Sequence, residues 1–244
     1  MMDWLRRASI TRPADPVVDL SGRTLPVAIR RHPRARRMTM RLARDGSSVH
    51  VTIPQWGRSE DALAFAHSRR DWLELQLGRC REPAVVDPAS DILFRGEAVQ
   101  IDWSSGHRRN PQLCGDALRC GGPQSHLQPR VQRWLERQAL EMMSTDLALY
   151  CDRAGLAPPE LRLSRAQRRW GSCSSTGTVR INWRLIQAPD FVRQSVVAHE
   201  VAHLIHFDHS PQFHRLLADL FGERLREADN WLKREGRTLY ARFG

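Results

Sequence analysis

The stretch VVAHEVAHLIHFDHSP, residues 196–211, sets histidines and a glutamate into an otherwise apolar segment with the pattern of a helix. Burying imidazoles and a carboxylate without partners costs several kcal/mol, so their presence indicates a function. An α-helix advances by about 100° and 1.5 Å per residue, which places His199 and His203 about 40° apart on one face. They are separated by about 6 Å along the axis, so both imidazoles can reach a single ion.

Glu200 lies beside these two histidines, close enough to contact a water on the ion but too far round the helix to be a ligand. This is the arrangement H-E-x-x-H, in which the glutamate is the general base. His209 follows where the helix should have turned, at the spacing of the pattern H-E-x-x-H-x-x-G-x-x-H. Three protein ligands with an open water position are typical of catalytic zinc. We therefore predict that Zn²⁺ is held by His199, His203 and His209, with Glu200 as the catalytic residue.

Four further residues of this region are weighed as ligands. His206 would lie about 10 Å beyond the first ligand on a straight helix, so we predict that it packs near the ion without binding it. His214 is expected on a helix surface or behind the ligands. Glu223 and Glu227 on a later helix remain alternatives to His209 as the third ligand, as in gluzincins.

The five cysteines are an odd number without Cys-x-x-Cys spacing, which predicts free thiols and no Cys-rich zinc module. The tripeptide Gly171-Ser172-Cys173 offers a separate alternative, in which the thiol or the hydroxyl is a nucleophile with a histidine base. Small and polar residues of this kind are equally typical of a tight loop. Nothing in the surrounding sequence marks Cys173 as activated.

The composition is that of an ordinary folded domain, with 41% apolar and 27% charged residues over 244 positions. No run of eighteen apolar residues exists, so we expect no transmembrane helix and no membrane partner. The first residues, MMDWLRRASITRPADP, lack the apolar core of a signal peptide. A cytoplasmic location is therefore predicted.

The net charge of +11 comes from a basic set in which Lys233 is the single lysine among 38 Lys and Arg residues. Arginine clusters occur at 30–37 (RRHPRARR) and 162–169 (RLSRAQRR). They are interpreted either as a surface that contacts nucleic acid or as solvated faces whose arginine content reflects genome composition. Nucleic acid is therefore a possible partner through an Arg-rich surface.

The order of the expected elements indicates an α+β fold. We predict a flexible tail over 1–20, a β-rich region with antiparallel strands over 21–106, a connector over 107–129 and a helix-rich domain over 130–244. The expected elements are strands at 25–31, 38–44, 49–53, 92–94, 99–103, 160–164 and 178–186, and helices at 59–78, 131–153, 189–205, 212–221 and 223–236. The Asp45-Gly46 pair predicts a hairpin between the second and third strands, and Gly96 predicts another short hairpin between the strands at 92–94 and 99–103.

Three segments together carry a resemblance to a known family: RRWGSCSSTGTVRINWRLIQAP at 168–189, VVAHEVAHL at 196–204 and DHSPQFH at 208–214. They resemble the YgjP-like metallopeptidase family, which is related to the SprT-like and WLM zinc peptidases. The likeness is strong over 130–236 and looser before it. Val201, Asp208 and His214 depart from the usual leucine, asparagine and aromatic residue of the family pattern.

The resemblance implies a zincin-like domain in which zinc is bound by His199, His203 and His209, and Glu200 is the general base. It implies hydrolysis of peptide bonds in a protein or peptide substrate, and the SprT-like relatives act on proteins bound to DNA. Arg169, Tyr150 and Tyr240 are candidates for stabilising the oxyanion, and the strand at 178–186 is the candidate edge for an extended substrate. The alternative is a zinc-containing, nucleic-acid-associated module without peptidase activity.

Overall fold

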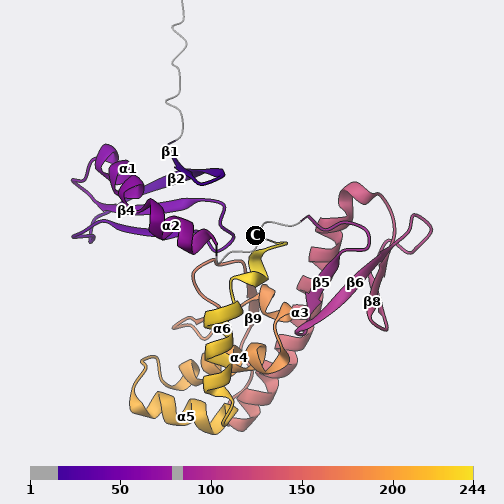
Figure 1. The fold of residues 1–244 in the computed structure, drawn as a ribbon. Coiled ribbons are helices and arrows are strands. Elements are labelled where there is room, and N and C mark those ends of the chain that lie inside the picture. Colours follow the sequence, from indigo (N-terminus) through magenta and orange to yellow (C-terminus); the bar gives the residue numbers. More distant parts are fainter. Residues whose placement is uncertain (1–15, 79–84, 244) are drawn as a thin grey trace, which may run out of the picture. The chain divides into compact units, whose positions relative to one another are not determined.

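The computed structural model describes residues 16–78 and 85–243, which fall into two compact units, Met1–Arg79 and Cys80–Gly244 (Figure 1). This division does not coincide with the boundaries at 106 and 129 expected from the sequence. Residues 1–15 of the expected tail lie outside the described residues, and Val17–Leu20 form a strand. Each unit is described by itself.

The first unit is a four-stranded sheet with two helices. Its strands follow the order β1-β2-β4-β3, and the alternation Val49, Val51, Ile53 places three fully buried side chains on one face. Its elements are β1 (Val17–Leu20), β2 (Arg23–His32), β3 (Thr39–Leu42), β4 (Val49–Pro54), α1 (Ser59–Ser68) and α2 (Arg70–Leu77).

Two details of this unit differ from the sequence prediction. Strands β3 and β4 form the predicted antiparallel hairpin, but β2 and β4 are parallel. After β2 the chain forms β3 at the edge of the sheet, and β4 then returns between β2 and β3. The single helix predicted over 59–78 is two helices, because Arg69 leaves the helical conformation at φ −110° and ψ 23°.

The second unit begins with another four-stranded sheet, in the order β5-β6-β8-β7. The predicted hairpin of β5 (Asp91–Phe94) and β6 (Glu97–Trp103) is confirmed. The segment 107–129, predicted as a connector, contains the short strands β7 (Gln112–Cys114) and β8 (Ala117–Cys120). Their strands are too short for a visible alternation, and Gly115 turns between them with φ 63°.

The rest of this unit combines the long helix α3 (Leu127–Arg153) with a three-stranded sheet of order β10-β11-β9. Strand β9 (Leu161–Ser164) is parallel to β11 (Val179–Asn182), and β10 (Gly171–Cys173) is antiparallel to it. The prediction of an edge strand over 178–186 is therefore wrong. The strand ends at Asn182, whose side chain accepts a hydrogen bond from the Arg184 N–H and caps a 3₁₀ helix, and β11 is central.

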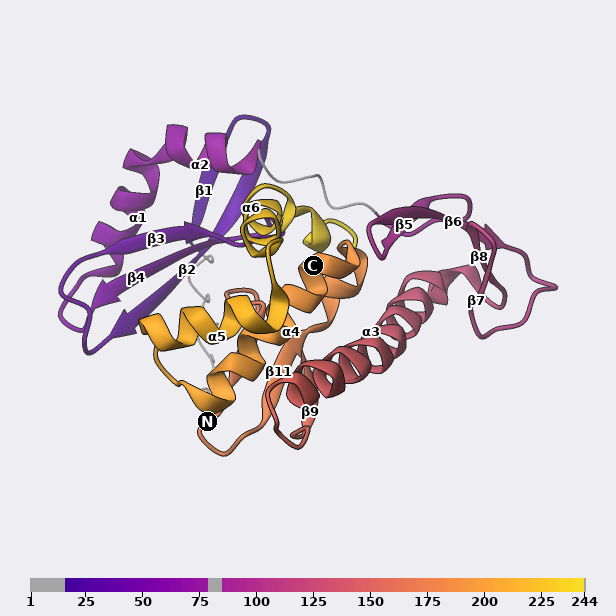
Figure 2. The same cartoon turned by 90° about the horizontal axis from the view of Figure 1, so that it is seen from below.

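Helix α4 (Asp190–Ile205) packs against α3, β10, α5 (Pro211–Phe221) and α6 (Leu225–Glu235), and Figure 2 shows it between α3 and α5. Its apolar residues Val197, Ala198, Val201 and Ala202 are fully buried. Ser210 caps α5 by accepting a hydrogen bond from the Phe213 N–H, with Pro211 in the first turn. The α+β class is confirmed, and no helix in the described part of the chain is long and apolar enough to cross a membrane.

Candidate active site

The structure brings His199 and His203 of α4 together with His209 of the turn before α5. One ligand nitrogen from each lies within 4.8 Å of the others, and the Nε2 atoms of His199 and His209 are 3.4 Å apart. Tetrahedral zinc with nitrogen ligands at about 2.0–2.1 Å separates two such ligands by about 3.3 Å. The three imidazoles therefore fit a single zinc ion.

His206 contributes to this cluster through its backbone. The Nδ1 atom of His203 lies 3.0 Å from the His206 carbonyl oxygen. Because a carbonyl can only accept, Nδ1 carries the proton and Nε2 keeps the lone pair that a metal requires. The helix ends at this residue, whose φ of −123° and ψ of 105° are extended. The imidazole of His206 is not part of the histidine cluster among the described residues.

Phe213 of α5 packs against all three imidazoles. Its ring centroid lies 4.5 Å from that of His203, 4.8 Å from that of His209 and 5.0 Å from that of His199, and the residue is fully buried. A close-packed ring under three side chains restricts their rotamers. Sequence reasoning gave Phe213 no role, although it lies in the DHSPQFH segment. His214 is exposed on the next turn position of α5.

The Glu200 carboxylate lies against β10, in the same cavity wall as His199, and the residue is only 4% exposed. Burial raises its pKa to about 7, while the charge of Arg169 and a hydrogen bond from the Cys173 backbone N–H act in the opposite direction. Its Oε2 atom is buried and has no hydrogen-bond partner among the described residues. A carboxylate oxygen left in this state costs about 1–3 kcal/mol, which a water molecule or substrate group at this oxygen would remove.

The partly buried position of His199 determines its protonation state. Burial, together with the neighbouring His203 and His209, lowers its pKa to about 4. It is therefore neutral at physiological pH, which is the form that binds a metal.

A family model described as YgjP-like, metallopeptidase domain, matches residues 36–235. The chain belongs to the YgjP-like family. It is accordingly a metallopeptidase, a hydrolase whose family implies a metal ion and a protein substrate. The resemblance found in the sequence is confirmed.

Two further comparisons complete this result. The YgjP-like chain is similar to the crystal structure of the metallopeptidase zymogen of Pyrococcus abyssi abylysin, with 20% sequence identity and a TM-score of 0.34. The likeness covers 41% of this chain and 97% of that chain. No curated protein matches the chain.

A cavity of about 270 Å³ opens beside Glu200 in the YgjP-like chain. Its wall combines polar groups near the carboxylate with apolar side chains from α4 and α6. The lining residues are Arg169, Trp170, Gly171, Ser195, Val196, His199, Glu200, Leu225, Asp229 and Leu232.

Strand β10 is the edge of its sheet next to this cavity. The backbone of Trp170 and of Ser174 bonds to the β11 side, through Asn182 N–H to Trp170 O at 2.7 Å and Ser174 N–H to Thr178 O at 3.0 Å. Pairing in antiparallel strands alternates, so Gly171 between them directs its N–H and C=O to the outer side. A Cβ on Gly171 would lie 2.3 Å from Glu200 Oε1, which only glycine avoids. The edge and its glycine were missed because the loop had no strand pattern.

The other residues weighed from the sequence are placed as follows. The Glu227 carboxylate pairs with Arg224 at 2.8 and 2.9 Å, and neither it nor Glu223 joins the histidines among the described residues. The hydroxyl of Tyr240 donates to the Ala166 carbonyl at 3.2 Å and accepts from the Asn182 amide, so it serves the scaffold.

Two further candidates, the oxyanion group Tyr150 and the nucleophile Cys173, do not fit their predicted roles. Tyr150 is buried against Phe221, so of the three candidate oxyanion groups only Arg169 lines the cavity. Burial raises the pKa of the Cys173 thiol and the Glu200 charge adds to this, which is the opposite of an activated nucleophile.

Proposed function

We propose that the chain is a zinc-dependent peptidase in which His199, His203 and His209 hold the ion and Glu200 is the general base. The observation that carries this is the meeting of three imidazole nitrogens beside a buried carboxylate with an unsatisfied oxygen. Zinc in such a site, when bound, lowers the pKa of its water and polarises a carbonyl. Three nitrogen ligands leave a coordination position open, whereas a structural zinc normally has four protein ligands. This favours an enzyme over a non-catalytic zinc module.

Glu200 has the properties of a proton carrier in peptide hydrolysis. A pKa of about 7 lets the carboxylate accept a proton from the attacking water and release it to the leaving amine. The Cys173 N–H keeps the carboxylate oriented toward β10. Arg169, which lines the same cavity, is the remaining candidate for stabilising negative charge on the substrate carbonyl.

The substrate is proposed to be an extended peptide that pairs with the outer edge of β10. Gly171 offers an N–H and a C=O there, and addition of a strand to a sheet edge supplies main-chain hydrogen bonds irrespective of sequence. One substrate side chain would enter the cavity toward Leu225 and Leu232. A cytoplasmic location stays a prediction from the sequence.

The experiment that tests this function uses Glu200→Gln, which keeps the shape of the side chain and removes the base. We expect the variant to fold and to bind one zinc per chain by elemental analysis, yet to lose about 10²–10⁴-fold in cleavage of casein. Glu141→Gln on the exposed surface of α3 is the matched control and should retain activity. Chelator-sensitive cleavage that is equally fast in the Glu200 variant would contradict the assignment.

A further inference from the structure

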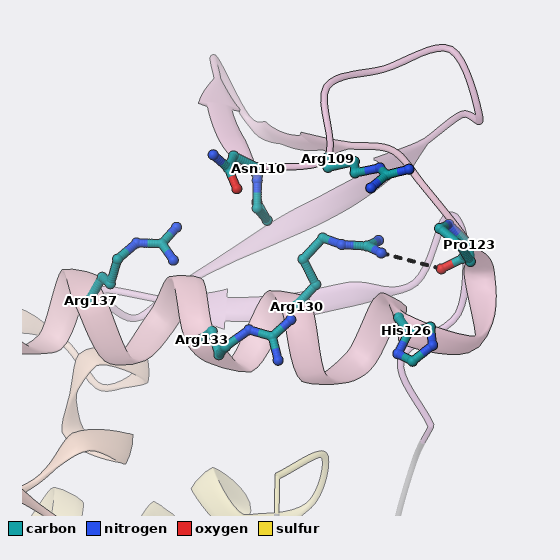
Figure 3. A pocket seen from close by; sticks show the side chains of 8 residues that line it. Arg109, Asn110, Pro123, His126, Arg130, Arg133 and Arg137 are labelled. Carbon is teal, nitrogen blue, oxygen red and sulfur yellow. Dashed lines mark hydrogen bonds between the residues drawn. The ribbon is translucent and has the colours of Figure 1, made fainter.

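A second pocket, of about 380 Å³, lies against the N-terminal half of α3 and shares no residue with the histidine site (Figure 3). All of its lining residues are basic or neutral. These are Arg109, Asn110, Pro111, Pro123, His126, Arg130, Arg133 and Arg137. None of them belongs to the two arginine clusters singled out in the sequence.

The basic residues of α3 share one face because they recur at intervals of three and four. Arg130, Arg133 and Arg137 of the helix, and His126 at its N-cap, follow this spacing and line the pocket (Figure 3). The opposite face is fixed by burial, with Val131, Trp134, Leu135 and Ala139 in the core. The register of the arginines is therefore set by the packing of the helix.

Arg109 lies on a loop across from the helix, and this loop packs closely against Gly121 and Gly122. The Gly121 N–H donates to the Arg108 carbonyl at 2.8 Å, and a Cβ on Gly121 would lie 2.0 Å from the His107 carbonyl oxygen. Gly122, at φ +83°, packs so that a Cβ would lie 3.1 Å from Arg130 Nη2 and 3.2 Å from Arg109 Cγ. The loop and the helix thus approach closely enough to present both side chains to one pocket.

The charge of this pocket is not compensated by the protein. None of the ion pairs among the described residues includes Arg109, Arg130, Arg133 or Arg137, whereas Arg95, Arg119, Arg162 and Arg224 each pair with a carboxylate. Arg130 donates instead to the Gly121 carbonyl at 2.6 Å, a neutral acceptor that fixes the guanidinium and leaves its charge.

The position on the helix adds to this positive potential. Helix α3 has no acidic residue in its first turn and no side-chain hydrogen bond at its N-cap. Because the N-terminus of a helix carries partial positive charge, cations near it are unfavourable and anions are favoured. Arg130 lies in this first turn, so an anion bound beside it would be favoured by both the guanidinium and the helix N-terminus.

We propose that this pocket binds phosphate groups. Guanidinium groups present paired N–H donors in a fixed fork that matches phosphate oxygens, and here four of them line one pocket that has no carboxylate among its lining residues. Free pyrophosphate and the backbone of single-stranded nucleic acid share this chemistry, and the experiment below separates them. The proposal does not depend on the peptidase function.

The test measures binding of a fluorescent single-stranded oligonucleotide of mixed sequence to the full chain by anisotropy, at several salt concentrations. Arg133→Glu with Arg137→Glu should weaken binding at least tenfold and lower the salt slope by about 1.4, since each lost phosphate contact removes about 0.7. Arg215→Glu with Arg226→Glu, an equal change of charge on exposed residues of α5 and α6, should weaken it less than threefold. Arg133→Lys with Arg137→Lys, which keeps the charge and loses the fork, should give an intermediate affinity. Circular dichroism verifies that each variant is folded.

Competition identifies the source of the phosphate. Displacement by pyrophosphate assigns the pocket to free phosphate groups, and displacement by unlabelled oligonucleotide alone assigns it to a nucleic-acid backbone. Equal weakening in the pocket and control variants would overturn the proposal, because binding would then follow net charge only. Equally strong competition by an acidic peptide of matched charge would overturn the phosphate assignment. Binding that vanishes with a chelator belongs to the histidine site and also contradicts the proposal.

Discussion

His203 and His206 contribute to the same centre in different ways, one through its ring and the other through its carbonyl. His209 lies at a different part of the cluster, where its ring nitrogen is 3.4 Å from that of His199. We predict that His209→Ala lowers zinc content sharply, because it removes one of three ligands. His206→Ala should leave zinc content near one per chain, since its carbonyl still accepts from His203. Elemental analysis after dialysis measures both, and equal retention would return Glu223 or Glu227 to consideration as the third ligand.

Gly171 controls the position of the general base by its lack of a side chain. A Cβ at this position would lie 2.3 Å from Glu200 Oε1 and 2.7 Å from its Cδ, so alanine must displace the carboxylate. We expect Gly171→Ala to lower kcat/KM at least tenfold while zinc content stays unchanged, since no ligand is touched. Gly106→Ala, where a Cβ would lie 4.0 Å from Ser104 Oγ, is the matched control. Unchanged cleavage by the Gly171 variant would show that the carboxylate is not held against β10.

At the residue scale the sequence predicted what depends on local geometry. The approach of His199 and His203 follows from helical periodicity alone. The contacts of Gly171 with Glu200 and of Phe213 with the three rings depend on how β10 and α5 pack on α4, and no spacing along the chain encodes that. Arg109 and Arg130 line one pocket although they are far apart in the sequence, where they form no cluster, so composition pointed to other arginines.

At the scale of elements, a network of ion pairs joins the β5–β6 hairpin to the start of α4. Asp190 at the N-terminus of α4 accepts from Arg95 Nε at 3.0 and 3.1 Å and from Arg193. Arg193, which is 3% exposed, also donates to Asp146 of α3 at 2.7 Å. The network links the β5–β6 turn, α3 and the first turn of α4.

This network predicts a pH dependence of stability. Burial raises the pKa of Asp190, but hydrogen bonds from Arg95 and Arg193 outweigh it and leave the pKa below its ordinary value. A carboxylate with a depressed folded pKa contributes stability above its unfolded pKa of about 3.9 and loses it as the pH falls through the folded value. Asp190→Asn should therefore lower the free energy of unfolding by about 1–3 kcal/mol at pH 7. The difference from the wild type should shrink below about pH 4.

Urea unfolding at pH 7 and near pH 3 measures this difference. Asp219→Asn on the exposed surface of α5 serves as the control and should change stability little at either pH. A penalty for Asp190→Asn that is the same at both pH values would mean that packing, not the ionised carboxylate, is responsible.

The element boundaries show where pattern reading fails. The long helix at 131–153 and the hairpin at 92–103 were predicted because their periodicity is long or their turn is marked by glycine. The stretch 178–186 alternates polar and apolar residues, and this alternation continues from β11 into the 3₁₀ helix, so it does not mark where the strand ends. The change from strand to 3₁₀ helix at Asn182 depends on the hydrogen bond that its side chain accepts from the Arg184 N–H.

At the scale of the whole molecule, the histidine site and its supporting core lie within one unit. The large buried cluster runs from Val86 to Phe243, and no residue of the first unit belongs to it. We predict that residues 80–244 produced alone unfold cooperatively and bind one zinc. Removal of the zinc by a chelator should lower the melting temperature in this fragment as in the full chain, because a ligand bound only to the folded state stabilises it. A fragment that is aggregated or lacks cooperative unfolding would show that the first unit is required for the second to fold.

Trp170 is both a wall of the cavity beside Glu200 and a neighbour of the Tyr240 ring, at a centroid distance of 5.6 Å. The chain contains eight tryptophans, and biosynthetic 5-fluorotryptophan gives each of them its own ¹⁹F resonance. A peptide side chain that enters the cavity must pack against the Trp170 indole and alter its resonance. In the Glu200→Gln variant, occupancy can then be titrated spectroscopically while the peptide bond stays intact, which allows a peptide library to be ranked by affinity before any cleavage assay exists.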